Sequence, residues 1–270
     1  MEAKPELWVT KYVNLLLGKP AALLLAALGF HPDPHAPIPN HVAMEFFVFA
    51  LAAILFLWLR PRLSVDRPGA TQQFMEVLFT NPFRLGLRDM VDDFLGHGGE
   101  QYLPMLGSIG MFILFANLIG MVPTLESPTA QYTVPLGCAF LVFVYYNWCG
   151  LRKNGPLRYA FQFAGPIPAL APLMVPLEIF SHLARMLSLT VRLWANMMAS
   201  ETIYGVILAL TIALSVFLEK MSVIGYLSTV VPLLVPVIFM ALHIFVAFIQ
   251  AFVFTILPVI YVSGAVAHQH

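Results

Sequence analysis

Long apolar stretches, separated by short polar segments, are the dominant pattern along this chain. Three of them have the length of a single membrane crossing and lie at 42–59, 103–122 and 133–150. A helix needs about 20 predominantly apolar residues to cross the hydrocarbon core of a bilayer. The pattern therefore predicts three conventional membrane spans in the first part of the chain.

Two longer apolar stretches, 170–219 and 223–266, follow with a very short connection between them. Within the first of these, 177–204 contains no proline or glycine. As a helix, this section alone would be about 42 Å long, whereas the hydrocarbon core is about 30 Å thick. We therefore expect two long, strongly tilted helices that face each other as a hairpin. Together with the three conventional spans, they predict an all-α, polytopic membrane protein with about five membrane helices.

Two further segments are expected to lie on the membrane surface. Residues 70–100 mix apolar and charged positions, which favours an amphipathic surface helix with an acidic end over a span. Near the N-terminus, Trp8 and Tyr12 would anchor an interfacial helix among the lipid headgroups. A true span and a cleaved signal peptide remain alternatives there. The expected organisation is an N-terminal interfacial extension, 1–41, followed by a single membrane domain, 42–270.

Basic residues cluster after two of the predicted spans. They are Arg60, Arg62 and Arg67 after the first span, and Arg152, Lys153 and Arg158 after the third. The loop after the second span carries Glu126 and no basic residue. Because cytoplasmic loops are enriched in lysine and arginine, the first and third spans are expected to end in the cytoplasm.

Composition narrows the class of function. The 270 residues are 60% hydrophobic and 10% charged, whereas soluble domains carry roughly 25% charged residues. The formal net charge is zero, which argues against a nucleic-acid partner. The sequence contains no glycine-rich phosphate loop, nucleophile elbow or zinc motif, and Cys138 and Cys149 fit inert buried thiols. We therefore expect no cofactor and no enzymatic site, and we expect polar side chains inside the membrane to carry the function.

The segment 176–201 carries an unusual set of polar side chains in apolar surroundings. They are Glu178, His182, Arg185, Arg192, Asn196 and Glu201. At 100° per residue, the first five fall within about 40° of one direction, whereas Glu201 lies about 140° away. A simple ion pair between Arg192 and Glu201 within the helix is therefore excluded. The alternative is a stripe buried for stability, but structural glue in membranes is usually Ser, Thr, Gly or Asn.

The second long stretch has no Asp, Glu, Lys or Arg after Lys220. Its notable polar residues are His243 and Gln250, which are seven positions apart and so lie on nearly the same face, about 10 Å apart along the axis. If the two long helices face each other, these side chains are positioned to meet the polar groups of the first helix. The alternative for His243 is a core histidine bonded to a neighbouring carbonyl.

Arg192 differs from its polar neighbours because arginine keeps its charge, whereas Glu and His titrate. Glu178 would lie about 21 Å from Arg192 on the cytoplasmic side, and Glu201 about 13 Å away on the other. A fixed positive charge between titratable groups holds a carboxylate ionised and repels a free cation, which suits an ion path with a barrier. Apart from Glu45, whose role stays open, no further intramembrane carboxylate is well placed. We therefore expect a partner subunit to supply the shuttling carboxylate.

Three segments resemble one known family. The run SLTVRLWANMMASE (188–201) resembles the signature of the a subunit of F-type ATP synthases, the stator channel protein beside the rotating c-ring. The run LHIFVAFIQAFVFTIL (242–257) is similar to that family's last helix, and FANLIGMVP (115–123) fits its Asn-containing helix. The resemblance covers roughly residues 42–266 and is most specific in the two long helices.

The resemblance implies roles for individual residues. Arg192 would be the essential arginine that faces the rotor carboxylate. The outer half-channel would be lined by Asn196, Glu201, His243 and Gln250. Glu178 and Ser188 would belong to the cytoplasmic half-channel and its approach. Departures from the usual family pattern are Ala195 and Ser200, where the family often has Gly, and Trp194, where it often has Phe or Tyr.

The function that the resemblance implies is a non-catalytic stator subunit that conducts protons through two half-channels to and from the c-ring, without a cofactor. The implied partners are the c-ring, b-type peripheral stalk subunits, the remaining ATP synthase subunits and the lipid bilayer, with no nucleic acid. The implied location is the bacterial inner membrane, with the C-terminus in the cytoplasm. The coupling ion, with protons as the default and sodium as the alternative, and the size of the ring stay open.

An ion-coupled secondary transporter is the main alternative function. That class favours inverted repeats and broken helices at mid-membrane, and the two halves of this sequence show no repeat. A purely structural membrane anchor would have no use for charged side chains that are costly to insert in lipid.

Overall fold

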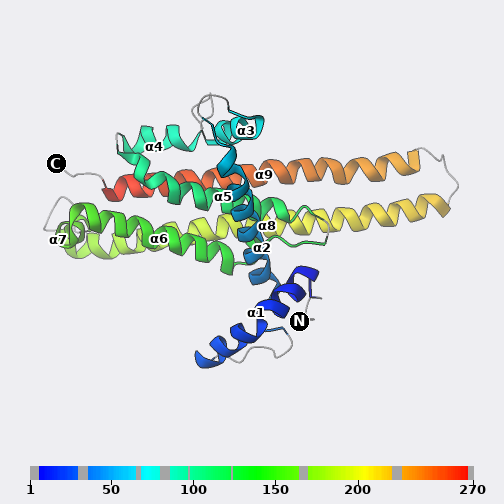
Figure 1. Ribbon diagram of the computed structural model, residues 1–270, viewed down its shortest axis with the longest axis horizontal. Coiled ribbons are helices and arrows are strands. Elements are labelled where there is room, and N and C mark those ends of the chain that lie inside the picture. The colour runs from blue at the N-terminus through cyan, green and yellow to red at the C-terminus, as the bar shows by residue number, and fades with distance from the viewer. Residues whose placement is uncertain are drawn as a thin grey trace. The chain divides into compact units, whose positions relative to one another are not determined.

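The computed structural model describes most of the chain, and every regular element in the described segments is a helix (Figure 1). The described residues are 6–29, 36–64, 68–79, 86–96, 98–122, 124–163, 170–220 and 227–266. The elements in chain order are α1 Trp8–Ala27, α2 Asn40–Leu59, η1 Arg60–Arg62, α3 Ala70–Phe79, α4 Leu87–Leu95, η2 Gly99–Tyr102, α5 Leu103–Ile119, η3 Pro128–Ala130, α6 Thr133–Asn154, α7 Pro156–Gln162, α8 Ala171–Lys220 and α9 Leu227–Val266.

Five of the described helical segments are long and apolar enough to cross a membrane. They are Asn40–Arg62, Gly99–Ile119, Thr133–Asn154, Ala171–Phe217 and Leu234–Val266. Each overlaps one of the apolar stretches identified in the sequence. The prediction of an all-α, polytopic membrane protein with about five membrane helices is therefore confirmed.

Internal packing divides the chain into two compact units, each assembled from separate stretches of sequence. Unit 1 contains Met1–Ile54, Leu114–Gln131 and Ala195–Ile249. Unit 2 contains Leu55–Ile113, Tyr132–Trp194 and Gln250–His270. Each unit thus includes part of α8 and part of α9. The division into an extension, 1–41, and one membrane domain, 42–270, stays a prediction.

The helices α8 and α9 are far longer than a bilayer is thick. They have 50 and 40 residues, which corresponds to about 75 and 60 Å. In unit 1 His243 of α9 bonds to Ser200 of α8. In unit 2 the guanidinium carbon of Arg185 on α8 lies 5.5 Å from the ring centroid of Tyr261 on α9. The two long helices therefore face each other within both units, as expected, and helices of this length fit a bilayer only when strongly tilted.

The predicted amphipathic segment is not one helix. The structure describes α3 and α4 as separate helices, and residues 80–85 lie outside the described part. Gly86, directly before α4, has an extended backbone (φ −69°, ψ 149°), so α4 begins afresh at Leu87. The amphipathic character holds for α4, which buries Leu87, Met90 and Val91 and leaves its acidic residues on the other side. The prediction of one amphipathic helix over 70–100 was therefore wrong, because α4 is a separate helix that covers only Leu87–Leu95.

The N-terminal helix α1 packs on the start of α2 within unit 1. The side chain of Asn14 accepts a bond from the Ile38 N–H (3.0 Å) and donates to the Ile38 carbonyl (3.1 Å). The ring of Trp8 lies edge-on to Phe47, with centroids 6.1 Å apart. The leucines on the rest of α1 are exposed, among them Leu15, Leu16, Leu23 and Leu24. This amphipathic packing suits an interfacial helix, and its place at the membrane surface stays a prediction.

In unit 2, α5 and α9 approach closely at Gly110. A Cβ at that position would lie 2.3 Å from the Thr255 hydroxyl oxygen. Small residues allow close backbone approach where membrane helices pack, so the contact between α5 and α9 depends on this glycine.

A side chain at this position is expected to destabilise the protein. Gly110→Leu must push Thr255 and α9 away, and overpacking of this kind costs about 1–3 kcal/mol. The measurement is the midpoint of thermal unfolding of the purified protein in detergent. The control is Gly137→Leu, since a Cβ there would meet no atom within 4 Å. Equal losses in both variants would contradict the prediction.

Candidate functional site

A polar cluster in unit 1 surrounds the carboxylate of Glu201 on α8. The backbone N–H of Ser127, in the loop after α5, donates to Glu201 Oε1 at 3.0 Å. That loop is itself tied to α5, because the Ser127 hydroxyl donates to the Ala116 carbonyl (2.9 Å) and the Thr129 hydroxyl donates to Asn117 Oδ1 (2.7 Å). The donor to Glu201 is therefore held in place by two further bonds.

His243 of α9 belongs to the same cluster. It is buried, with 7% of its surface exposed. Its Nε2 lies 3.4 Å from the Asn117 carbonyl oxygen, and its Nδ1 bonds to the Ser200 hydroxyl. A carbonyl can only accept, so this geometry requires a proton on Nε2, and Nδ1 then accepts from Ser200. His243 therefore bonds to a neighbouring carbonyl, which was the alternative considered for it, and it also contacts α8, the first of the two long helices.

Glu201 and His243 both line a small cavity. It measures about 20 Å³, and its walls include Gly120, Tyr204 and Met240. A cavity needs about 10–15 Å³ of such volume to hold one water. The two titratable side chains therefore share a space for about one water molecule. We call Glu201, His243, Ser127, Ser200 and Asn117 the Glu201 cluster.

Gly120 limits what can stand beside this carboxylate. A Cβ at Gly120 would lie 2.8 Å from the Ser127 Cβ and 3.0 Å from Glu201 Oε1. Any side chain would therefore displace either the loop or the acid. Glycine here serves the close approach of α5 and α8 rather than a special backbone angle.

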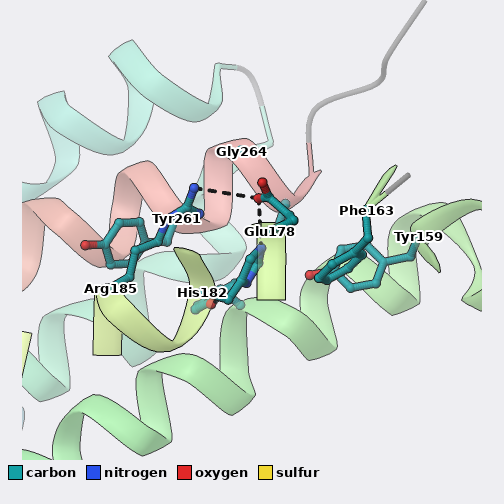
Figure 2. Close-up of a pocket in the computed structure, with 9 residues that line it drawn as sticks. Tyr159, Phe163, Glu178, His182, Arg185, Tyr261 and Gly264 are labelled. Atoms are coloured by element: carbon teal, nitrogen blue, oxygen red, sulfur yellow. Dashed lines mark hydrogen bonds and ion pairs between the residues drawn. The ribbon is translucent and has the colours of Figure 1, made fainter. Parts of the chain in front are cut away.

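A second polar cluster lies in unit 2, around His182 (Figure 2). Glu178 Oε1 lies 3.3 Å from His182 Nε2, one helical turn further along α8, and 3.9 Å from Arg185 Nη2. The other ring nitrogen of His182, Nδ1, is 2.7 Å from the hydroxyl of Tyr146 on α6. We call Glu178, His182, Arg185 and Tyr146 the His182 cluster.

The His182 cluster borders a cavity of about 160 Å³, which Tyr159, Phe163 and Tyr261 help to line. Tyr159 lies on α7 and donates to Asn147 Oδ1 at 2.8 Å. Burial is the main reason why the pKa of Tyr159 is raised; the Arg185 charge lowers it and the Glu178 charge raises it. The phenol therefore stays protonated at physiological pH and remains a donor on the wall of the cavity.

Arg192 lies on α8 between the two clusters in sequence. Its side chain is exposed, and within the described segments it forms no ion pair with an acid of its own chain. Ser188 and Asn196, one turn to either side, are exposed as well. The buried positions of this part of α8 are Leu189, Thr190, Leu193 and Met197. The helix is thus covered on its leucine side and presents Arg192 on an open side.

A family model described as ATP synthase A chain matches residues 42–263. The chain belongs to the ATP synthase subunit a family. Among curated relatives, ATP synthase subunit a of Solibacter usitatus is 45% identical over 247 residues, which cover 92% of this chain and 95% of that protein. The subunit a of Koribacter versatilis is 40% identical over 266 residues, covering 98% of both chains, and that of Aquifex aeolicus is 36% identical over 230 residues, covering 85% and 98%. The resemblance noted in the sequence is therefore confirmed over nearly the whole chain.

The structure brings together some of the residues to which the family resemblance gave a role. Glu201 and His243 line one cavity, and Glu178 lies in the other cluster. Gln250 is buried, with 7% of its surface exposed. Asn196 and Ser188 are exposed on α8, away from both cavities. Membership of the subunit a family does not by itself test any of these roles.

Several residues of the two clusters carried no signal in the sequence. Ser127 acts through its backbone N–H, which no side-chain pattern reveals. Tyr146 is one aromatic residue in an apolar span, and nothing local distinguishes it from a core residue. Its partner His182 was evident as a polar residue of the segment 176–201, but the sequence did not show that Glu178, His182 and Arg185 contact one another rather than a partner.

Proposed function

We propose that this subunit a conducts protons through two half-channels to and from a rotating c-ring, and so couples proton flow to rotation and ATP synthesis. Membership of the family makes the chain a stator subunit of the ATP synthase membrane sector. What we propose beyond this membership is the route that protons take through the subunit. In this role the subunit binds no nucleotide and carries out no covalent chemistry.

The exposed side chain of Arg192, which forms no ion pair with an acid in the described segments, is the observation that carries the proposal. It lies fourteen residues after Glu178 and nine before Glu201 on the uninterrupted helix α8. A lone arginine inside a membrane costs at least about 2.5–3.5 kcal/mol, and its own chain, where described, offers it no acid. An acidic side chain from another subunit, reaching the open side of α8, would neutralise this charge. A rotor carboxylate is such a partner.

We assign one cluster to each proposed half-channel, and Arg192 lies between the two clusters in sequence. The outer half-channel is assigned four residues: Glu201, His243, Asn196 and Gln250. Two of these titratable or polar groups, Glu201 and His243, line the water-sized cavity of the Glu201 cluster. Glu178 and Ser188 are assigned to the cytoplasmic one. A proton that enters by one path neutralises the ring carboxylate, travels with the ring, and leaves by the other path because Arg192 blocks the direct route.

The partners and the location follow from the same proposal. The c-ring contacts the open side of α8, while b-type peripheral stalk subunits and the remaining ATP synthase subunits hold the complex together. The chain is a multi-pass membrane protein, and we place it in the bacterial inner membrane with a cytoplasmic C-terminus. Purification tests this assignment: a stator subunit co-purifies with a small, hydrophobic, multi-copy protein and a soluble ATPase, whereas a secondary transporter binds its substrate alone in detergent.

Cysteine cross-linking is expected to show which side of α8 faces the ring. Ala199 is exposed and lies within about 20° of Arg192 around the helix. With Cys138 and Cys149 replaced, Ala199→Cys is expected to form a disulfide with a cysteine placed on the ring helix beside its carboxylate. The matched control is Leu193→Cys, because Leu193 is fully buried in this chain. Equal cross-linking of both variants, or of neither, would contradict the proposed ring-facing side.

A further inference from the structure

The cavity beside the His182 cluster is large enough for a chain of waters. Its volume is about 160 Å³, and one water occupies about 30 Å³ in the liquid. Its lining includes three tyrosines, Tyr146, Tyr159 and Tyr261, and the charged residues Glu178 and Arg185. Such a polar lining suits mobile water, which a proton can cross by hopping between hydrogen bonds.

His182 and Glu178 both line this cavity, and both ring nitrogens of His182 are engaged. Nε2 faces the Glu178 carboxylate at 3.3 Å, and Nδ1 faces the Tyr146 hydroxyl at 2.7 Å. The side chain of His182 is 12% exposed and that of Glu178 is 40% exposed. An imidazole can take up a proton on one nitrogen and release one from the other. The ring is thus placed to pass protons rather than only to hold the acid in position.

Packing fixes the orientation of the ring. Phe163 stacks on it with centroids 5.0 Å apart, and the Tyr146 ring lies 5.5 Å away. Both ring nitrogens are therefore kept on their partners. A histidine retained only to fill space would need neither of the two polar contacts.

The charges around the ring favour release of a proton after its uptake. Arg185, on the same helix, is permanently positive and lies 3.9 Å from the Glu178 carboxylate that also faces His182. The other titratable groups at this cavity are tyrosines: Tyr146 from α6, Tyr159 from α7 and Tyr261 from α9. Glu178 attracts a proton to the ring, whereas Arg185 repels the imidazolium that results. A proton on His182 is therefore not trapped.

We propose that His182 is a proton-transfer residue of the cytoplasmic half-channel, which passes protons between Glu178 and the water of the cavity, with Tyr146 as the positioning residue for its ring. The inference rests on the proposed proton-conducting function. A proton leaves the Glu178 carboxyl for the imidazole, and the imidazolium gives a proton to cavity water. Each transfer breaks one O–H or N–H bond and forms another. The imidazole is then neutral again, and Glu178 stays a carboxylate until the next proton reaches it.

The test uses the whole ATP synthase in proteoliposomes, with proton flux driven by a membrane potential after removal of the soluble ATPase. His182→Gln keeps a polar side chain that can bond to both partners but cannot carry a proton. We expect flux at neutral pH to fall by about tenfold or more, in line with the loss of one acid–base group. We also expect the rate to lose the part of its dependence on the cytoplasmic-side pH that an imidazole contributes, and added imidazole to restore part of the flux. Flux with the wild-type rate and pH profile would overturn the proposal.

A second variant decides the question if His182→Gln does not assemble. Tyr146→Phe keeps the aromatic packing and removes the bond to Nδ1, and is expected to slow flux severalfold and shift the pH profile. The control is Tyr132→Phe, which changes an exposed tyrosine and is expected to behave as wild type. A wild-type rate and pH profile in Tyr146→Phe would overturn the proposal. Normal coupling in Arg192→Ala would instead refute the underlying function, so the two failures are distinguishable.

Discussion

Arg192→Ala is expected to abolish coupled ATP synthesis while the complex still assembles. The side chain is exposed on α8 and forms no ion pair within the described part of its own chain. Its removal therefore costs little folding energy but deletes the proposed barrier between the half-channels and the proposed partner of the ring carboxylate. We expect synthesis to fall by at least about a hundredfold, the scale on which removal of a preorganised electrostatic group acts. The measurement is ATP synthesis by proteoliposomes under an imposed proton gradient.

Two variants control for this result. Arg88→Ala removes another arginine, whose ion pair with Glu100 at 3.1 Å is largely exposed and worth about 0–1 kcal/mol; it is expected to synthesise ATP normally. Arg192→Lys keeps a positive charge and separates the loss of charge from the loss of the guanidinium shape. Normal coupled synthesis in Arg192→Ala would refute the proposed function.

Glu201→Gln is expected to give the second largest effect, a slowing of proton flux by about ten- to a hundredfold, because one acid–base group is lost from the proposed outer half-channel. Glutamine has almost the same shape and can still accept the bond from the Ser127 N–H, so the fold is retained. His243→Ala removes the other titratable wall of the small cavity and is expected to slow flux as well. ATP-driven proton pumping, followed with a pH-sensitive dye, measures both.

The matched control is Glu100→Gln, which makes the same chemical change at an exposed carboxylate. It is expected to pump at the wild-type rate. If Glu201→Gln and His243→Ala both pump normally, these two residues are not part of the path. If only one of them is slow, the proton passes that residue alone.

Most of the fold could be predicted because lipid imposes a length and a composition on every span. The apolar stretches fix the existence of five membrane helices, and the absence of Pro and Gly between Leu177 and Tyr204 predicts the unbroken course of α8. The failure at 70–100 has a local cause. Hydrophobic and charged positions continue through that region, so the pattern reads as one helix, while the extended backbone at Gly86 separates α4 from what precedes it.

For the candidate site, the sequence could predict only which residues of one helix lie on the same side of that helix. Register placed Arg192 and Glu201 on different sides of α8, and the structure has Arg192 on the open side and Glu201 in a cluster with His243. Register cannot tell which residues of other elements complete a cluster. The Ser127 N–H and the Tyr146 hydroxyl come from a loop and from α6, and their contacts depend on tertiary packing.

The tight fit around Gly120 has a consequence for the coupling ion. A Cβ at Gly120 would lie 3.0 Å from Glu201 Oε1, and the cavity that Glu201 and His243 line measures only about 20 Å³. It has room for about one water but not for the hydration shell of an alkali metal. A proton needs no such shell, since it crosses a single water by exchanging bonds. Where the proposed outer half-channel passes Glu201, sodium could therefore move only after shedding its waters or displacing the 124–130 loop.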